Sequence, residues 1–172
     1  MTVEELKSYI ETTESDTVLE AKLQAIESLI RAYTHNNFLQ RGIRFCTDIV
    51  DGKLHLSSNF LKVNDSVQIS QSKYNDGVYY IVSSDGSYLT LSDDLIDEEQ
   101  ILVTKVKYPQ DVKMGVVAML KWDNDNRDKV GVSSETISRH SVTYFNMDGD
   151  NSIMGYPRSL MGFLEPYKKA RF

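Results

Sequence analysis

The run Asp123-Asn124-Asp125-Asn126 contains the residue types that bind calcium. An EF-hand loop supplies such oxygens from alternating positions, but it also needs glycine at its sixth position and a bidentate glutamate at its twelfth. Counted from Asp123, these positions hold Asp128 and Ser134. The spacing therefore disfavours a calcium loop, and we interpret the run as a solvated polar segment. The similar fragment Asp148-Gly149-Asp150-Asn151 is interpreted as a turn.

Nucleophilic catalysis would need a cysteine or hydroxyl beside a histidine that is held in place by a third group. Cys46 is the one cysteine, and the three histidines, His35, His55 and His140, lie in separate segments without an HxxH or ExxH spacing. One cysteine allows no internal disulfide and no cysteine metal cage. We therefore interpret Cys46 as a small apolar residue within a strand. The chain also has no glycine-rich phosphate loop, and we predict no catalytic, cofactor or metal residue.

The charge of the chain bears on its partners. The 172 residues carry a formal net charge of -6, whereas a protein that binds nucleic acid by neutralising phosphates is expected to be basic. Residues 42–108 contain six Lys/Arg against ten Asp/Glu, including the acidic run Asp93–Glu99. An oligonucleotide-binding barrel would show a basic groove. No apolar run is long enough to span a membrane, and the first residues lack an apolar signal core, so we expect a cytosol-like setting.

Two helices are expected before residue 42. The first is predicted over residues 3–13, with Thr2 as its N-cap and Glu5 as the capping-box partner. The second begins after Ser15 or Asp16 and runs to about residue 38. Apolar residues that recur every three or four positions give it the clearest helical pattern in the chain. They are Leu19, Leu23, Ile26, Ile30 and Tyr33.

The pattern changes at Gly42 to short alternating runs that are separated by turn residues. Asp51-Gly52 is a strong hairpin signal, and it follows a run that places Ile43, Phe45, Thr47 and Ile49 on one face. Later runs place Val67 with Ile69, Val78 with Tyr80 and Val82, and Leu89 with Leu91. Five or six strands at this spacing predict a small antiparallel barrel or sandwich.

A third long helix, of about five turns, is predicted within the stretch Pro109–Lys129, because proline suits a first helical turn and the apolar positions again follow a helical period. Its far end gives way to the polar run Asp123–Lys129. Its stripe is Val112, Val116, Met119, Leu120 and Trp122, and we interpret Trp122 as a core residue. The stretch Ser141–Phe145 is expected to be extended. Tyr156-Pro157 is expected to open a last helix whose inward residues are Leu160, Met161, Phe163 and Leu164. Pro166 disfavours its continuation, so residues 167–172 form a kinked last turn or a tail.

These elements predict an α+β protein. Residues 1–41 and 109–172 would form a small α-helical bundle of about four helices, and residues 42–108 would form a β-rich domain, a small antiparallel barrel or sandwich, inserted in a loop of that bundle.

The order of several segments resembles that of the head–tail connector (adaptor, head-completion) proteins of tailed bacteriophages. The segments are the helix ending in Trp122 with Asn126-Arg127, the stretches Val130–Ile137 and Ser141–Tyr144, and the closing Leu160–Tyr167 helix with basic residues after it. The resemblance covers the two N-terminal helices and everything from Pro109 onward. The β-rich insert departs from the compact members of that family, so no role for it is implied.

The resemblance implies a structural virion protein without catalysis or cofactors. Such proteins are made in the bacterial cytoplasm and form a ring, usually twelve-fold, below the portal in the virion neck. The ring extends the channel for double-stranded DNA, which passes without sequence-specific binding, and it offers a docking surface to the stopper or tail-completion protein. The family's C-terminal segments reach toward the portal protein, which implies that role for Tyr167, Lys168, Lys169, Arg171 and Phe172. An aromatic and basic tail also suits a docking peptide.

A ring also offers a reason for the extended stretch before the last helix. Extended backbone with unpaired groups is unfavourable alone, and a neighbouring subunit could complete it by strand addition. We therefore include Ser141, Val142, Thr143 and Tyr144 among the predicted partner-binding residues. Two other functions stay open at this point. One is a hydrolase with a site between barrel and helices, and the other is a small barrel-containing nucleic-acid-binding protein.

Overall fold

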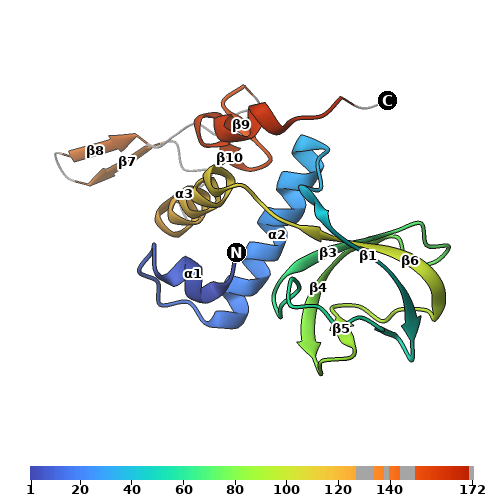
Figure 1. Cartoon of the computed structure of the whole chain (residues 1–172). Coiled ribbons are helices and arrows are strands. Elements are labelled where there is room, and N and C mark those ends of the chain that lie inside the picture. Colours follow the sequence, from blue (N-terminus) through green and yellow to red (C-terminus); the bar gives the residue numbers. More distant parts are fainter. Residues whose placement is uncertain (127–133, 138–139, 144–149, 171–172) are drawn as a thin grey trace. The chain divides into compact units, whose positions relative to one another are not determined.

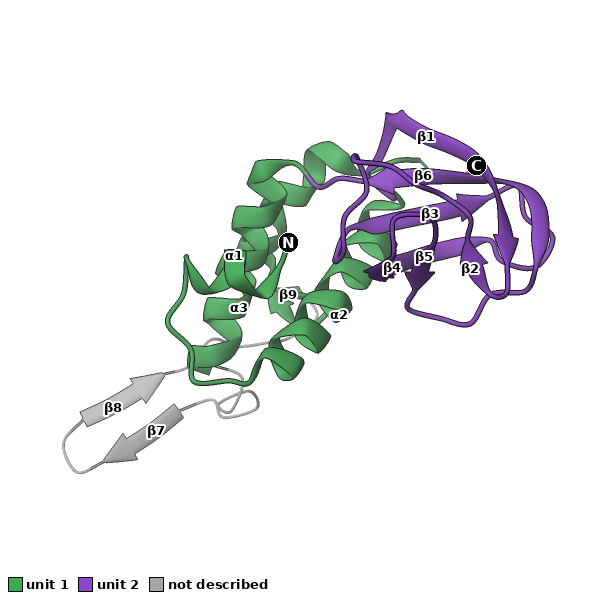
Figure 2. Cartoon of the chain, turned by 60° about the horizontal axis from the view of Figure 1, so that its bottom comes forward, with its two compact units in different colours: residues 1–36, 109–172 green, residues 37–108 purple. Residues whose placement is uncertain are grey.

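The computed structural model of the chain describes residues 1–126, 134–137, 140–143 and 150–170. It divides into two compact units, the first made of residues 1–36 and 109–172 and the second of residues 37–108 (Figure 2). The first unit holds the described helices, and the second is a closed antiparallel barrel, so the predicted α+β class is confirmed. The helices are α1 (Val3–Lys7), α2 (Asp16–Thr34), α3 (Gln110–Asn126) and the 3-10 helix η2 (Arg158–Tyr167) (Figure 1).

The two N-terminal helices begin at the predicted caps. The Thr2 hydroxyl accepts a hydrogen bond from the Glu5 N–H at 3.2 Å, and the Ser15 hydroxyl accepts one from the Val18 N–H at 3.5 Å. The ends differ from the prediction. Helix α1 stops at Lys7 rather than Thr13, and at its C-cap the Ser8 hydroxyl donates to the Glu5 carbonyl at 2.6 Å. Helix α2 ends at Thr34 rather than Phe38, because the next residue adopts a left-handed conformation.

Helix α2 packs through the predicted stripe. Four of its five residues, Leu19, Leu23, Ile26 and Ile30, are buried, while Tyr33 is half-buried. The same is true of α3, in which Val112, Val116, Met119 and Leu120 are buried. Trp122 is only half-buried, so its assignment to the core was wrong. Its ring lies 5.8 Å from the ring of Tyr156, whose O–H donates to Asp123 at 2.8 Å.

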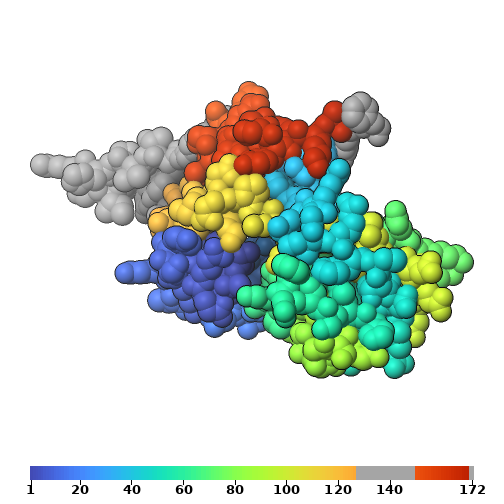
Figure 3. All heavy atoms as spheres, viewed as in Figure 1, coloured from blue at the N-terminus to red at the C-terminus, as the bar shows by residue number. Residues whose placement is uncertain are grey.

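The last helix lies directly on α3, as the space-filling view shows (Figure 3). Of its four predicted inward residues, Met161 and Leu164 are buried and Leu160 and Phe163 are half-buried. The prediction that Tyr156-Pro157 opens this helix was wrong. These two residues form strand β10 (Tyr156–Pro157), which pairs with β9 (Ser152–Ile153) across a turn with positive φ at Met154 and Gly155.

One glycine allows the close approach of these two helices. Gly115 is buried in α3, and a Cβ atom there would lie 2.2 Å from Cζ of Phe163. Real Cβ atoms do not approach so closely, so the Phe163 ring occupies the space that a side chain at residue 115 would need.

The second unit is a six-stranded barrel with the order β1-β2-β5-β4-β3-β6, closed by antiparallel pairing of β1 with β6. The Asp51-Gly52 hairpin turn is confirmed, because both residues have positive φ as a type I′ turn requires. The strands are β1 (Leu39–Val50), β2 (Lys53–Leu54), β3 (Ser66–Ser70), β4 (Gly77–Ser84), β5 (Leu89–Leu91) and β6 (Glu98–Val106).

The barrel interior is filled by aliphatic side chains from every strand. The apolar residues grouped on one face of β1, of β3 and of β5 contribute to it, with Ile49, Val67 and Leu89 nearly inaccessible to solvent. In β4 the grouped residues lie on the face that points away from the interior. Ile81 is fully buried whereas Val82 is 56% exposed, so Val78, Tyr80 and Val82 face outward. Cys46 lies in β1 as expected, but it is exposed because its neighbours Phe45 and Thr47 take the inward positions.

The barrel unit starts at Asn37, five residues before the predicted boundary, and its two ends lie together. The Lys107 N–H donates to the Phe38 carbonyl at 2.9 Å, and the rings of Phe38 and Tyr108 are 4.9 Å apart. Strand β1 is already paired with β6 at Leu39, so the backbone becomes part of the barrel before Gly42.

Because the ends of the second unit meet, we expect it to be removable. Replacing residues 37–108 by a short Gly/Ser linker should leave a helical protein that melts cooperatively, since the buried stripes of α2 and α3 belong to the first unit. Circular dichroism and thermal unfolding would test this, with the excised residues 37–108 expressed alone as the companion protein. Loss of the helical signal in the shortened chain would mean that the barrel is needed for the first unit to fold.

Candidate interaction sites

Two of the predicted C-terminal contact residues, Tyr167 and Lys169, are bonded to the ends of α2 and α3. The Tyr167 O–H donates to the two carboxylate oxygens of Asp111 at 2.9 and 2.7 Å. The Tyr167 carbonyl accepts from the Asn36 amide at 3.2 Å, and the Lys169 N–H donates to the Thr34 carbonyl at 2.8 Å. The chain therefore stays on the first unit through Lys169 instead of leaving it at Pro166. Arg171 and Phe172 lie outside the described residues.

A charged cluster accompanies this segment. Glu165 accepts hydrogen bonds from the Tyr33 O–H at 2.8 Å and from Lys168 Nζ at 2.9 Å, and the same Nζ lies 4.0 Å from the centre of the Tyr33 ring. The hydrogen bond from Lys168, followed by that from Tyr33, holds the pKa of Glu165 below its ordinary value of 4.5. The contacts with Tyr33 and then Glu165 raise the pKa of Lys168, and the Asp111 carboxylate raises the pKa of the Tyr167 phenol.

Because of these pKa shifts, the contribution of the cluster to the stability of the folded state depends on pH. A carboxylate with a lowered pKa in the folded state stabilises that state above its unfolded pKa and loses this effect as the pH falls through the folded value. The contribution of Glu165 is therefore lost in acid, below pH 4.5. Tyr167 has a raised pKa, so its contribution is present below its ordinary value of 10.0 and is lost as the pH rises through the folded pKa.

Substituting Tyr33→Phe tests the assignment of these shifts. The change removes the hydroxyl donor to Glu165, so we expect the pKa of Glu165 to rise toward 4.5. An NMR titration of the side-chain carboxyl would measure it. Tyr9→Phe, at an exposed tyrosine of the same unit, is the control and should leave the pKa of Glu165 unchanged. A Glu165 pKa that is the same in wild type and Tyr33→Phe would contradict this arrangement.

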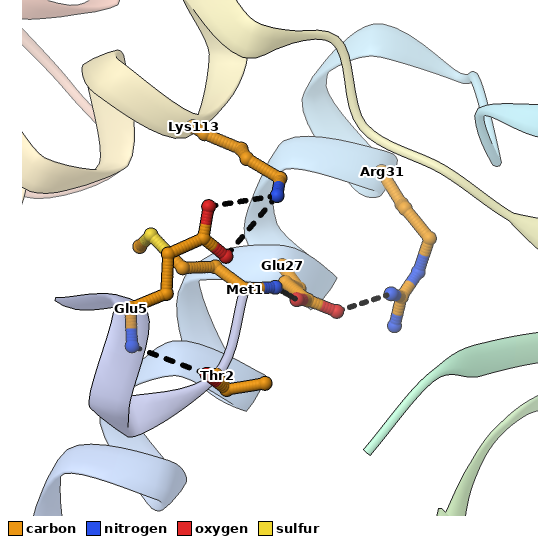
Figure 4. Close-up of polar contacts among 6 residues, drawn as sticks. All are labelled: Met1, Thr2, Glu5, Glu27, Arg31 and Lys113. Atoms are coloured by element: carbon orange, nitrogen blue, oxygen red, sulfur yellow. Dashed lines mark hydrogen bonds and ion pairs between the residues drawn. The ribbon is translucent and has the colours of Figure 1, made fainter. Parts of the chain in front are cut away.

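A second group of charges joins the first three helices of the same unit (Figure 4). Glu27 is 7% exposed, and its carboxylate lies 3.5 Å from the Met1 ammonium and 3.7 Å from Nη1 of Arg31. Lys113 of α3 donates to both carboxylate oxygens of Glu5 in α1, at 2.9 and 3.1 Å. The Glu5 carboxylate thus binds α3, and only the Thr2 half of the predicted capping box is seen.

This group of charges was not predicted from the sequence. The i, i+4 spacing of Glu27 and Arg31 is a signal for a helical ion pair, but such pairs are usually exposed. Nothing local indicates that the Glu27 carboxylate is covered, since that depends on the segment that carries Met1. The Glu5–Lys113 pair joins residues 108 positions apart and has no local signature.

The other predicted contact residues lie in a separate two-stranded sheet. Strand β7 (Ser134–Ile137) pairs with β8 (His140–Thr143), with Ser134 opposite Thr143 and Thr136 opposite Ser141. The expected extended backbone is therefore confirmed for Ser141, Val142 and Thr143, while Tyr144 and Phe145 lie outside the described residues. One edge of β8 is already paired within the chain, so a neighbouring subunit is not needed to complete that edge.

The described residues also locate the groups that were considered for chemistry. His35 ends α2, and His55 stacks on Tyr88 with ring centres 4.9 Å apart. Within the described ranges, no three His, Cys, Asp or Glu residues are arranged to hold a metal ion. None of the helices in this part of the chain has the length and apolar character required for a membrane span.

Comparison with known proteins does not assign the chain to a family. No model of a known protein family matches it, and no curated protein matches its sequence. The functional argument therefore depends on the residues, the contacts and the order of elements given above.

Proposed function

We propose that this chain is a structural protein of the neck of a tailed bacteriophage, where a ring of its copies joins the portal vertex to the tail and extends the DNA channel. The observation that carries the proposal is the division of the chain. Residues 1–36 and 109–172, which include all the segments on which the resemblance to head–tail connectors depends, belong to one compact unit. In this proposal that unit is a small helical bundle and the barrel is a domain inserted in it.

The C-terminal segment is the proposed portal contact. The hydrogen bonds of Tyr167 and Lys169 fix the start of this segment on α2 and α3. Lys168, Lys169 and Ala170 are exposed, so the chain is accessible from the point at which these bonds end. Basic and aromatic residues that follow such an anchor suit insertion into a groove of a partner, because arginine and aromatic side chains dominate binding energies.

The β7–β8 hairpin is the proposed contact with a neighbouring subunit. A two-stranded hairpin alone is marginally stable in water, and each strand has a second edge that can pair. Added strands from an adjacent copy would stabilise it. Hydrogen exchange of residues 141–143 should then slow on assembly, whereas equal protection in the monomer and the ring would contradict this contact.

The acidic composition fits a channel through which DNA must slide. A wall rich in lysine and arginine would bind phosphates by release of counterions and would retard the DNA. With a net charge of -6, the chain as a whole opposes such binding. Retention on immobilised DNA at low salt would argue for the nucleic-acid-binding alternative.

A short truncation tests the function without disturbing the fold. Removing only Arg171 and Phe172 keeps every C-terminal contact described above, so the melting temperature should not change. Phage that carry this truncation should accumulate DNA-filled heads without tails, counted by electron microscopy, and should form fewer plaques.

The control is Arg158→Ala, which removes a positive charge from the start of η2 and should leave plaque numbers unchanged. Normal tail joining without any copy of this protein would reject the proposed function outright.

A further inference from the structure

The two ends of the barrel differ in chemistry. Because neighbouring strands run antiparallel, the β1–β2, β3–β4 and β5–β6 connections lie at one end, and the β2–β3 and β4–β5 connections lie at the other. We call the first the acidic end (residues 51–52, 71–76 and 92–97) and the second the serine end (residues 55–65 and 85–88).

The acidic end is held in shape by a buried amide. Asn75 is 3% exposed, and its side chain accepts from the Ile96 N–H at 2.9 Å while donating to the Ile96 carbonyl at 2.9 Å. This exchange joins the β3–β4 connection to the β5–β6 connection. The Asp97 carboxylate adds the β1–β2 turn by accepting from the Gly52 N–H at 2.9 Å.

The acidic end presents two large exposed side chains among its aspartates, and Lys73 Nζ lies 4.9 Å from the centre of one of them, the Tyr74 ring. Tyr74 and Ile96 are 58% and 56% exposed, although Tyr74 precedes the buried Asn75 and the Ile96 backbone is bonded to the Asn75 amide. Asp93 and Asp94 are also exposed. Burial, and then the charges of Asp93 and Asp76, raise the pKa of the Tyr79 phenol at this end. No described residue pairs with the Asp94 carboxylate.

Hydrogen bonds also hold the connections of the serine end in place, but here they use the carboxylates of Asp65 and Asp85 as acceptors. Lys105 Nζ donates to the Phe60 carbonyl at 2.8 Å and to Asp65 at 2.6 Å, which fastens the β2–β3 connection to β6. The Asp85 carboxylate accepts from the N–H groups of Ser87 and Tyr88, and these bonds hold the pKa of Asp85 below its ordinary value.

A hollow of about 270 Å³ opens between the two connections of the serine end. Hydrogen-bond donors line it, and the lining includes no carboxylate; its polar members are Ser57, Ser58, Asn59, Lys62 and Ser84. No described residue pairs with the Lys62 ammonium, which is exposed. Beside the hollow, Phe60, Val63 and Val82 are 64%, 48% and 56% exposed. Val63 and Val82 are neighbours, because the Asn64 N–H donates to the Ile81 carbonyl at 2.8 Å.

We infer that the serine end of one barrel binds the acidic end of a second copy, with Asp94 of the neighbour entering the donor-lined hollow near Lys62 and Ile96 and Tyr74 packing on Phe60, Val63 and Val82. The complementarity is twofold, since unpaired carboxylates meet unpaired donors and exposed apolar side chains meet one another. A contact between two different surfaces of the same chain repeats from copy to copy and closes as a ring when the rotation allows it. The inference thus rests on the proposed ring, and it adds to the β7–β8 contact a second pair of surfaces that would join neighbouring copies.

Charge exchange in the full chain tests this contact. Lys62→Glu places like charges at the interface within each homogeneous sample, and so does Asp94→Lys, so each should weaken self-association in sedimentation velocity by about tenfold or more. A mixture of the two variants should recover the wild-type association, because the new carboxylate at position 62 of one chain then meets the new ammonium at position 94 of the other, while the remaining contacts are native. Lys121→Glu, an exposed site in the helical unit with the same change in net charge as Lys62→Glu, is the control and should associate like the wild type.

Disulfide trapping gives a second measurement. In a Cys46→Ser background, Ser58→Cys and Asp94→Cys chains should form a disulfide-linked dimer when mixed and should not form dimers when each is alone. Dimers of Ser58→Cys alone, or no mixed dimer at the highest soluble concentration, would overturn the inference. Rings that form but ignore the charge exchange would overturn it while leaving the proposed function intact. Circular dichroism confirms that each variant is folded.

Discussion

Replacing Gly115 by valine is expected to lower the free energy of unfolding of the helical unit by about 3 kcal/mol, the upper part of the usual range for overpacking. The first added carbon would lie 2.2 Å from the Phe163 ring, so the ring must leave its place between η2 and α3. Urea unfolding followed by the helical circular dichroism signal would measure the loss. Helix propensity works in the opposite direction, since valine is better than glycine inside a helix, so a measured loss reports the clash.

Gly162→Val is the matched control for this prediction. Gly162 lies in η2 next to Phe163, and nothing is within 4 Å of the position that its Cβ would take. Its substitution should change the free energy of unfolding by less than about 0.5 kcal/mol, as surface changes usually do. In a double-mutant cycle, Phe163→Ala should cost less in the Gly115→Val protein than in the wild type. Equal costs would show that the ring and residue 115 do not compete for one space.

Replacing Glu27 by alanine is expected to destabilise the helical unit by a similar amount, about 3 kcal/mol, because breaking a covered ion pair leaves the opposite charges without compensation. The carboxylate is shared by the Met1 ammonium and the Arg31 guanidinium, and the side chain of Arg31 is only 13% exposed. The same urea experiment would measure the effect. It should persist at high salt, because covered pairs are screened less than exposed ones.

Glu20→Ala provides the comparison, since Glu20 is an exposed acid of the same helix. It should alter the free energy of unfolding by less than about 0.5 kcal/mol. Arg31→Ala in the Glu27→Ala background should cost little more than the single change, because the uncompensated cation is then gone. If Glu27→Ala and Glu20→Ala were equally mild, the Met1–Glu27–Arg31 ion pairs drawn in Figure 4 would contribute nothing measurable to stability.

The sequence predicted those elements whose cause is local. Helix α2 has a serine cap and an apolar residue every three or four positions, and both determine where it starts and which side it buries. The Asp51-Gly52 turn was equally clear, because few other residue pairs accept positive φ at both positions. Alternation also grouped the buried residues of β3 and β5 correctly, because successive side chains of a strand point to opposite faces.

The errors arose where contacts between distant residues decide. In β4 both faces carry large apolar or aromatic residues, so alternation alone did not identify Ile81 as the buried residue. Trp122 lies at the end of α3, where Tyr156 from a distant hairpin determines how much of it is covered. The hairpin β9–β10 in turn takes Tyr156 and Pro157 from the expected helix.

The candidate sites also depend on contacts between residues that are far apart in the sequence. The composition of the C-terminal segment suggested a docking peptide, but its attachment through Asp111, Asn36 and Thr34 comes from residues at least 56 positions away. The difference between the two barrel ends was also hidden. The acidic run Asp93–Glu99 is obvious in the sequence, whereas the hollow near Lys62 combines two connections that only the closed barrel brings together.

The meeting of Phe38 and Lys107 has a practical consequence. The first and last residues of the barrel unit are close together, because a backbone hydrogen bond joins Lys107 to Phe38. The unit can therefore be replaced by another domain whose termini are equally near, without stretching the chain on either side. A fluorescent reporter or an affinity domain grafted between Asn36 and Pro109 would therefore label the helical unit at a known place in the chain.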